Sequence, residues 1–349
     1  MSIAMTRRGF MTQTALSGLA ASLLPAGSAR IAAQREESAT THRFITANGM
    51  RIHLAEQGRG PAVLMCHGFP ESWYSWRHQL PALAAAGVHA VAPAMRGYGQ
   101  TDAPRDIDQY TILHLVGDVV GIADALGPDP VVIVGHDWGA TVAWNAALLR
   151  PDRFRAVIAL SVPFRPRGPA RPTAAMPQTE SAVYYQLYFQ SPGVAEAELE
   201  RDLRKTMRVL MPGESVPGGM VPRNGGWLDG RIAAPSLPSW LTEQDLDFFV
   251  AEFRRTGFRG GLNYYRNLDR NWELMAPFAG RGITVPALFM AGDRDAVLTY
   301  PGFGEAVKNL SRSVPQLRKT ILLPGCGHRT QQERAADVNA AMVEFLTSL

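Results

Sequence analysis

The sequence predicts an α/β protein in which a mostly parallel central sheet is flanked by helices and carries an inserted helical lid. Two observations predict this fold class. Short apolar runs alternate with helical segments over residues 40–164 and again over 281–349. Over residues 165–280 the alternation stops, and helices with a long Gly/Pro-rich loop replace it. We therefore divide the chain into two core segments and the lid between them.

The expected strands follow from apolar runs and from apolar–polar alternation. Residues 51–56 alternate like a half-buried strand, whereas residues 62–66 are apolar throughout, as expected for a strand buried on both faces. Strands that alternate with helices indicate parallel βαβ units. Further strands are expected at 88–92, 131–134, 156–160, 287–290 and 320–323, and helices at 112–126 and 139–149.

Within the lid, two helices are predicted on either side of the Gly/Pro-rich loop at 212–238. The first is expected at 195–210, where leucine and methionine side chains recur at helical spacing. The second should begin at Thr242, because Thr242 and Asp245 have the spacing of a capping box. Gly257 should end this second helix.

The composition is that of an ordinary globular protein and gives no sign of a nucleic-acid partner. Of the 349 residues, 46% are hydrophobic and 19% are charged. The formal net charge is +4, but without the three arginines of residues 1–33 the chain has 32 basic against 31 acidic side chains. Cys66 and Cys326 lack metal-ligand spacing. Two buried free thiols are favoured for them, and a disulfide is the alternative.

Residues 1–33 have the order of features typical of a twin-arginine signal peptide. Arg7 and Arg8 are followed by a modest apolar stretch and then by small residues that offer cleavage sites. The apolar stretch is too short to span a membrane. A tail with a chance arginine pair is the alternative. We expect export to the periplasm or beyond, without stable membrane insertion.

The strongest chemical signal lies at residues 134–140, where an apolar strand ends and a helix begins. Small residues around Asp137 permit a sharp turn, which is the setting of the nucleophile in the α/β-hydrolase fold, with Asp in place of Ser. Aspartate is ionised at neutral pH and can attack an alkyl carbon to form an ester. A residue that only caps the helix is the alternative.

A second motif, at residues 67–70, directly follows the strand at 62–66. We expect the backbone N–H groups of Phe69 and Trp138 to form an oxyanion hole, with His67 on the same substrate-binding loop. A turn that simply ends the strand is the alternative.

Two late loops supply a base and an acid. His328 lies after the strand at 320–323, where the histidine of this fold belongs. A carboxylate after the strand at 287–290 should accept the histidine N–H and hold its tautomer. We choose Asp295 for this role, and Asp293 is the alternative.

Together these segments resemble the epoxide hydrolase family of the α/β-hydrolase fold, and above all the hydrolase domain of mammalian soluble epoxide hydrolases. The matches extend through the core and the lid and cover nearly all of the chain after residue 40. The family pattern has an aromatic residue after the catalytic histidine, where this chain has Arg329, a departure that bears on the pocket mouth. The matching stretches are HGFPESWYSW (67–76), GHDWG (135–139), YQLYFQ (185–190), GFRG (257–260), LNYYRN (262–267) and CGH (326–328).

The resemblance implies that two lid tyrosines bind the epoxide oxygen, and the matching positions are Tyr185 and Tyr265. Spacing alone does not distinguish them from the neighbouring Tyr184, Tyr188 and Tyr264. The remaining tyrosines are expected to pack within the lid.

The resemblance also implies a reaction in two steps. Asp137 forms a hydroxyalkyl ester with the epoxide, and water activated by His328 with Asp295 then hydrolyses this ester to a vicinal diol. No metal or organic cofactor is expected, and the expected partner is a small-molecule epoxide. No oligomeric state is predicted.

Two other functions compete with this one. A haloalkane dehalogenase would share the Asp137 chemistry and could hold a halide with Trp138 or Trp227, but Phe69 offers no donor, and the paired tyrosines favour an epoxide. A non-catalytic binding protein would typically have lost the nucleophile or the histidine, and here both are present.

Overall fold

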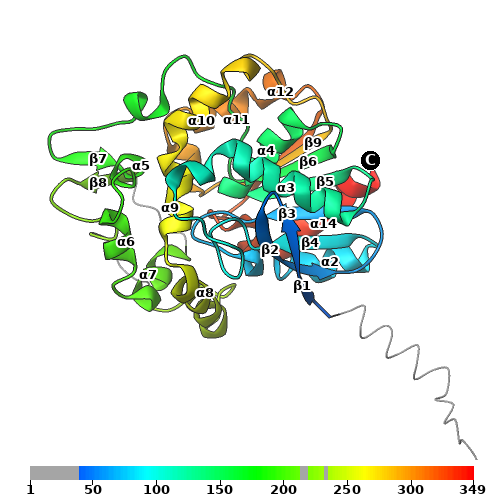
Figure 1. Ribbon diagram of the computed structural model, residues 1–349, viewed down its shortest axis with the longest axis horizontal. Helices are drawn as coiled ribbons and strands as arrows, with labels where there is room; N and C mark the ends of the chain where they lie inside the picture. Colours follow the sequence, from blue (N-terminus) through cyan, green and yellow to red (C-terminus); the bar gives the residue numbers. More distant parts are fainter. Residues whose placement is uncertain (1–38, 213–218, 232–234) are drawn as a thin grey trace, which may run out of the picture. The chain divides into compact units, whose positions relative to one another are not determined.

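The computed structural model describes residues 39–212, 219–231 and 235–349, which contain an eight-stranded sheet of order β1-β2-β4-β3-β5-β6-β9-β10 (Figure 1). In this sheet β1–β2 and β2–β4 pair antiparallel, and the other neighbours pair parallel. The predicted fold class is therefore confirmed. The strands are β1 (Thr41–Ala47), β2 (Met50–Gln57), β3 (Ala62–Cys66), β4 (His89–Pro93), β5 (Val131–His136), β6 (Phe154–Leu160), β9 (Ala287–Gly292) and β10 (Leu317–Leu323).

Helices cover both faces of the sheet, because the strand side chains alternate between two apolar cores. On one face α3 and α4 pack with residues such as Leu64 and Ile133, and on the other α2 and α14 pack with Val63 and Val132. This two-sided burial explains why the central strands are apolar throughout. The core helices are α2 (Gln79–Ala85), α3 (Ile112–Leu126), α4 (Trp138–Leu149), α11 (Phe303–Lys308), α12 (Leu310–Ser313), α13 (Thr330–Glu333) and α14 (Ala335–Thr347).

The core elements agree closely with their predictions. The strand predicted at 62–66 and the helix predicted at 112–126 have the predicted bounds, and the other core elements differ by up to three residues at an end. Strand β1 was not predicted. Within it Ala47 alone is buried, so the segment has no apolar run that would indicate a strand.

The segment between β6 and β9 leaves the sheet and forms the lid, which Figure 1 shows in green to yellow. The boundaries at residues 165 and 280 stay predictions. The lid elements are β7 (Ala182–Tyr184), α5 (Tyr185–Tyr188), α6 (Val194–Leu199), α7 (Leu203–Leu210), β8 (Met220–Pro222), α8 (Glu243–Thr256), α9 (Arg259–Arg266) and α10 (Leu268–Leu274), with β7 and β8 paired antiparallel.

One lid helix is confirmed and the other is corrected. Helix α8 begins at the predicted capping box of Thr242 and ends before Gly257, which has a φ of 64°. The single helix predicted at 195–210 is wrong, since α6 and α7 are separate helices. Asp202 lies between them in extended backbone and caps α7 by accepting the N–H of Lys205. Apolar spacing continues across this break and so did not reveal it.

Two other predictions concern the leader and the cysteines. The signal peptide predicted at residues 1–33 lies outside the described residues. Among the residues that the structure does describe, no helix has the length and apolarity needed to cross a membrane. Cys66 and Cys326 are buried free thiols, as favoured from the sequence.

Candidate active site

Asp137 occupies the tight turn between β5 and α4, at the carboxyl end of the sheet. Its backbone has a φ of 54°, a left-handed conformation that is costly for a residue with a side chain. The neighbouring glycines allow this turn. A Cβ on Gly139 would collide with the carbonyl oxygen of Cys66, and a Cβ on Gly135 would collide with the carbonyl oxygen of Gly139. The turn places the carboxylate at the N-terminus of α4, where negative charge is favoured.

Two partners contact the Asp137 carboxylate. The backbone N–H of Phe69 donates to Oδ1 at 2.8 Å, and Nε2 of His328 lies 3.6 Å from Oδ2. Burial alone would raise the pKa of Asp137, but His328 and the Phe69 hydrogen bond outweigh it and lower the pKa. The carboxylate is therefore ionised and ready to act as a nucleophile.

His328 pairs with Asp295 and not with Asp293. Its Nδ1–H donates to the Asp295 carboxylate, with distances of 3.0 and 3.1 Å to the two oxygens. Asp295 is buried and also accepts the N–H of Val297. Asp293 is exposed and accepts the N–H of Gly325 instead. Of the two acids that the sequence left open, the geometry selects Asp295.

The charges around His328 determine its protonation state. Burial alone would lower its pKa, but the carboxylates of Asp295 and Asp137 outweigh burial and raise the pKa to about 10. Arg329 opposes this rise. The imidazole is therefore protonated at neutral pH and forms an ion pair with Asp137. Neutralising Asp137 would remove one of the charges that hold this proton.

A cavity of about 60 Å³ joins these core residues to the lid. Asp137 and His328 line it from the core, and Tyr185 and Tyr265 line it from the lid. The two tyrosine rings lie 5.9 Å apart between centroids. The structure thus brings the predicted nucleophile, base and tyrosine pair around one space. The other lining residues are Phe69, Pro70, Leu210, Trp227, Arg231, Val297, Tyr300 and Arg329.

The hydroxyl groups of the two cavity tyrosines are held in place and kept protonated. The side-chain amide of Gln186 donates to the Tyr185 hydroxyl at 3.0 Å, and the indole of Trp138 hydrogen-bonds the Tyr265 hydroxyl. Burial raises the pKa of both phenols well above the ordinary value. Each can therefore serve as a hydrogen-bond donor and acid over the whole physiological pH range.

The other three lid tyrosines do not line this cavity. The Tyr264 hydroxyl donates to the carbonyl of Arg96 at 2.9 Å, and the Tyr188 hydroxyl donates to Glu198 at 2.9 Å. Tyr184 is buried against Val297 and Tyr300, and its ring contacts Tyr185 without lining the cavity. Residue spacing could not distinguish the two expected tyrosines from their neighbours. In the structure, Tyr185 and Tyr265 are the two of these five tyrosines that line the cavity.

His67 does not reach the cavity, contrary to its expected place among the substrate-binding residues. Its Nε2 accepts the N–H of Met95, and its Nδ1–H donates to the carbonyl of Gly68. Burial lowers its pKa to about 4, so the ring is neutral. His67 therefore supports the loop that presents Phe69. The side chain of Trp138 packs edge-on against Tyr265 and does not line the cavity, and the oxyanion role of its backbone N–H stays a prediction.

A buried charged network connects the loops of the site, and none of its members was a predicted site residue. The Glu71 carboxylate accepts the N–H of Gly68 at 3.1 Å, Nδ1–H of His136 at 2.9 Å and Nη1–H of Arg329 at 3.0 Å. His136 donates its other ring N–H to the carbonyl of His328 at 2.7 Å. His136 thus connects the Glu71 carboxylate to the loop that carries His328.

Glu71 thereby joins the loops that carry Phe69, Asp137 and His328. Burial alone would raise its pKa, but His136 and Arg329 hold the pKa well below its usual range. Arg329, which stands where the family pattern has an aromatic residue, is only 3% exposed. It lines the cavity and balances the Glu71 charge. The sequence contained two signals for this network. Glu71 lies inside an aromatic-rich stretch, and Arg329 directly follows His328.

Comparisons with known proteins show which family and structures this chain resembles. The family model described as alpha/beta hydrolase fold matches residues 61–335. Epoxide hydrolase A of Mycobacterium tuberculosis is 46% identical over 321 residues, covering 89% of this chain and 98% of that protein. Bifunctional epoxide hydrolase 2 of Sus scrofa is 41% identical, covering 89% of this chain and 56% of that protein. The solved structure of an epoxide hydrolase from an endophytic Streptomyces matches with a TM-score of 0.85 and 46% identity, covering 88% of this chain and 95% of that one.

Proposed function

The chain belongs to the epoxide hydrolases of the α/β-hydrolase fold, and we propose that it converts an epoxide and water to a vicinal diol through a covalent ester on Asp137. One observation carries this mechanism. An ionised carboxylate and two phenol hydroxyls border the same cavity, and a histidine–aspartate pair lies beside the carboxylate. Such a cavity can attack an epoxide carbon from one side and receive the ring oxygen on the other.

In the first step, the carboxylate of Asp137 attacks an epoxide carbon. Oδ1 already accepts the Phe69 N–H, so Oδ2 is the attacking oxygen. The carbon–oxygen bond of the ring breaks, and the ring oxygen takes a proton from Tyr185 or Tyr265. The raised phenol pKa makes the resulting tyrosinate a strong base. It recovers a proton from the His328 imidazolium, which leaves a neutral imidazole beside the ester.

In the second step, water hydrolyses the ester. Esterification has removed the negative charge of Asp137, so the pKa of His328 falls and the imidazole can accept a proton from water. The water attacks the ester carbonyl, and the N–H groups of Phe69 and Trp138 stabilise the oxyanion. His328 then protonates the departing alkoxide, the diol leaves, and the Asp137 carboxyl returns its proton to His328. Asp295 holds the imidazole in position throughout.

The dehalogenase alternative has less support. Its leaving halide needs N–H donors, and Trp227 lines the cavity with an indole N–H that has no partner among the described residues. Tyr185 and Tyr265, however, offer paired hydroxyl groups that can give a proton to an oxygen, which favours an epoxide. The named relatives described above are epoxide hydrolases.

Trapping the ester tests the mechanism. We expect His328→Gln to stop the second step and to accumulate protein whose mass exceeds the native mass by one substrate molecule, with the adduct on the peptide that contains Asp137. Asp293→Asn is the matched control from the neighbouring loop, and it should turn over the epoxide without an adduct. Full turnover by His328→Gln, with no adduct at any time, would exclude His328 from ester hydrolysis.

We further propose that the protein is exported through a twin-arginine signal. Support comes from the order of Arg7-Arg8, an apolar stretch and small residues within the first 33 residues. Cell fractionation of the full chain should recover epoxide hydrolysis outside the cytoplasm, and the double variant Arg7→Lys/Arg8→Lys should retain the activity inside. The same distribution for both proteins would contradict export by this route.

A further inference from the structure

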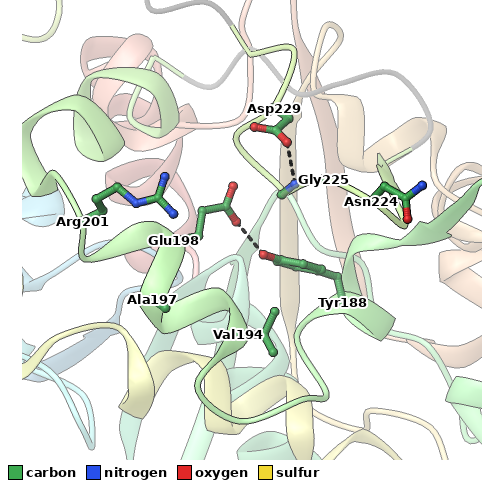
Figure 2. Close-up of a pocket in the computed structure, with 9 residues that line it drawn as sticks. Tyr188, Val194, Ala197, Glu198, Arg201, Asn224, Gly225 and Asp229 are labelled. Atoms are coloured by element: carbon green, nitrogen blue, oxygen red, sulfur yellow. Dashed lines mark hydrogen bonds between the residues drawn. The ribbon is translucent and has the colours of Figure 1, made fainter.

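Glu198 lies on the lid helix α6, outside the catalytic cavity, and holds the loop that forms one wall of that cavity. Its Oε1 accepts the backbone N–H of Leu228 at 2.8 Å, and its Oε2 accepts the backbone N–H of Trp227 at 2.9 Å. Oε2 also accepts the hydroxyl of Tyr188 at 2.9 Å, a bond that Figure 2 shows. One carboxylate thus fixes two successive peptide groups of the loop.

Glu198 and Tyr188 border a surface groove of about 280 Å³, drawn in Figure 2. Two of its acids are already engaged within the protein, since Glu198 binds the loop and Asp229 accepts the N–H of Gly226 at 2.7 Å. The groove therefore does not have the character of a vacant ligand site. Glu198 supplies two of the hydrogen bonds that hold the backbone of this loop.

Trp227 belongs to this loop and lines the catalytic cavity, so the position of the loop affects the shape of the cavity. Its ring stacks on Tyr185 at 6.0 Å between centroids with an interplanar angle of 17°, packs edge-to-face with Phe189, and lies tilted against Phe69 at 6.3 Å between centroids. Among the described residues, the indole N–H has no hydrogen-bond partner. The ring is therefore held by its backbone and by ring packing. The backbone restraints are the two N–H bonds to Glu198 and a bond from Arg231 to the Trp227 carbonyl at 2.9 Å.

We propose that Glu198 is a positioning residue that sets the substrate size limit of the cavity by fixing Trp227 over Tyr185. The cavity of about 60 Å³ is far smaller than the roughly 300–1,000 Å³ of typical ligand pockets. An epoxide ring fits this space, but a bulky substituent has to displace a wall. The anionic carboxylate forms charge-assisted bonds to both loop N–H groups. In a glutamine, one of the two acceptors becomes an NH₂ donor, so the loop loses a bond and Trp227 can yield.

The test rests on the proposed epoxide hydrolysis and compares two substrates of different size, a short terminal alkyl epoxide and a diaryl epoxide such as stilbene oxide. Glu198→Gln should raise the ratio of kcat/KM for the diaryl epoxide over the alkyl epoxide by roughly tenfold, mainly through a lower KM. Trp227→Ala should shift the ratio in the same direction. The double variant should add little beyond Trp227→Ala alone, because both changes act on one wall.

Glu180→Gln is the matched control, since Glu180 is an exposed lid carboxylate that does not line the groove. It should leave the size ratio unchanged. An unchanged ratio in Glu198→Gln, or additive effects in the double variant, would overturn the role of Glu198. A wild-type protein that hydrolyses neither epoxide would instead refute the proposed function, so the two failures are distinguishable.

Discussion

The cavity has a floor, formed by core residues such as Asp137 and His328, and a roof, formed by lid residues such as Tyr185 and Trp227. Different interactions hold the floor and the roof in place. On the floor, charged groups of the core are buried and bonded to one another, as in the pair of His328 with Asp295 and the network around Glu71. On the roof, aromatic rings of the lid pack against each other, and the anchor of Trp227 is the half-buried Glu198 at the lid surface. Buried charge networks tolerate little movement, whereas ring packing can rearrange.

This difference indicates a division of labour. In the proposed mechanism, the core fixes the geometry of bond formation, and the proposed role of Glu198 makes the lid determine which substrates fit. Changes in the floor should therefore abolish chemistry or stability, and changes in the roof should alter rate and selectivity by smaller factors.

The largest effect is expected on the floor from Asp137→Ala. Among the described residues that line the cavity, no other carboxylate could replace this nucleophile. We expect kcat to fall on the order of 10⁴-fold or more, with the fold retained. Steady-state turnover and circular dichroism measure both quantities. A loss of less than tenfold would remove Asp137 from the reaction and with it the distinction between floor and roof.

The next effect concerns stability. Arg329→Leu leaves Glu71 buried without one of its cations, so we expect the free energy of unfolding to fall by about 3–5 kcal/mol. Adding Glu71→Gln should recover part of this loss. The lid offers a comparison in Arg266→Leu, which should cost less because its partner Glu196 keeps some contact with solvent. Urea unfolding measures the three variants, and an equal or larger cost in the lid would contradict the comparison.

The sequence predicted the core more completely than it predicted the lid. In the core, two-sided burial leaves apolar runs that give strand bounds within a few residues, and the glycines beside Asp137 indicate the turn. In the lid, Tyr264 and Tyr265 are adjacent, and which of them reaches the cavity depends on how α9 packs. The pairing of Glu71 with His136 and Arg329 joins residues separated by 65 and 258 positions, which no local pattern reveals.

A smaller effect is expected from the roof. Tyr185→Phe and Tyr265→Phe should each slow ester formation by on the order of 10²-fold, because each removes one donor to the ring oxygen. Hydrolysis of an ester already formed should change less. Rapid-quench single turnovers separate the two steps. Equal slowing of both steps would indicate that the tyrosines only shape the lid.

The smallest effect is a shift in pH dependence. In the resting enzyme Asp137 and Asp295 raise the pKa of His328 to about 10. The ester lacks the Asp137 charge, so hydrolysis should rise with pH through a pKa below that value. Arg329 lowers the pKa of His328, so Arg329→Leu should move this rise to higher pH. A shift to lower pH would contradict the expectation that Arg329 lowers the pKa of His328.

The most direct measurement is a single turnover of an epoxide, with enzyme in excess, in water labelled with heavy oxygen. If Asp137 forms an ester, the label enters its carboxylate in the first cycle, and the first diol carries an unlabelled oxygen that came from the protein. Label in that first diol, with none in the Asp137 peptide, would mean that water attacks the epoxide directly and that no ester forms.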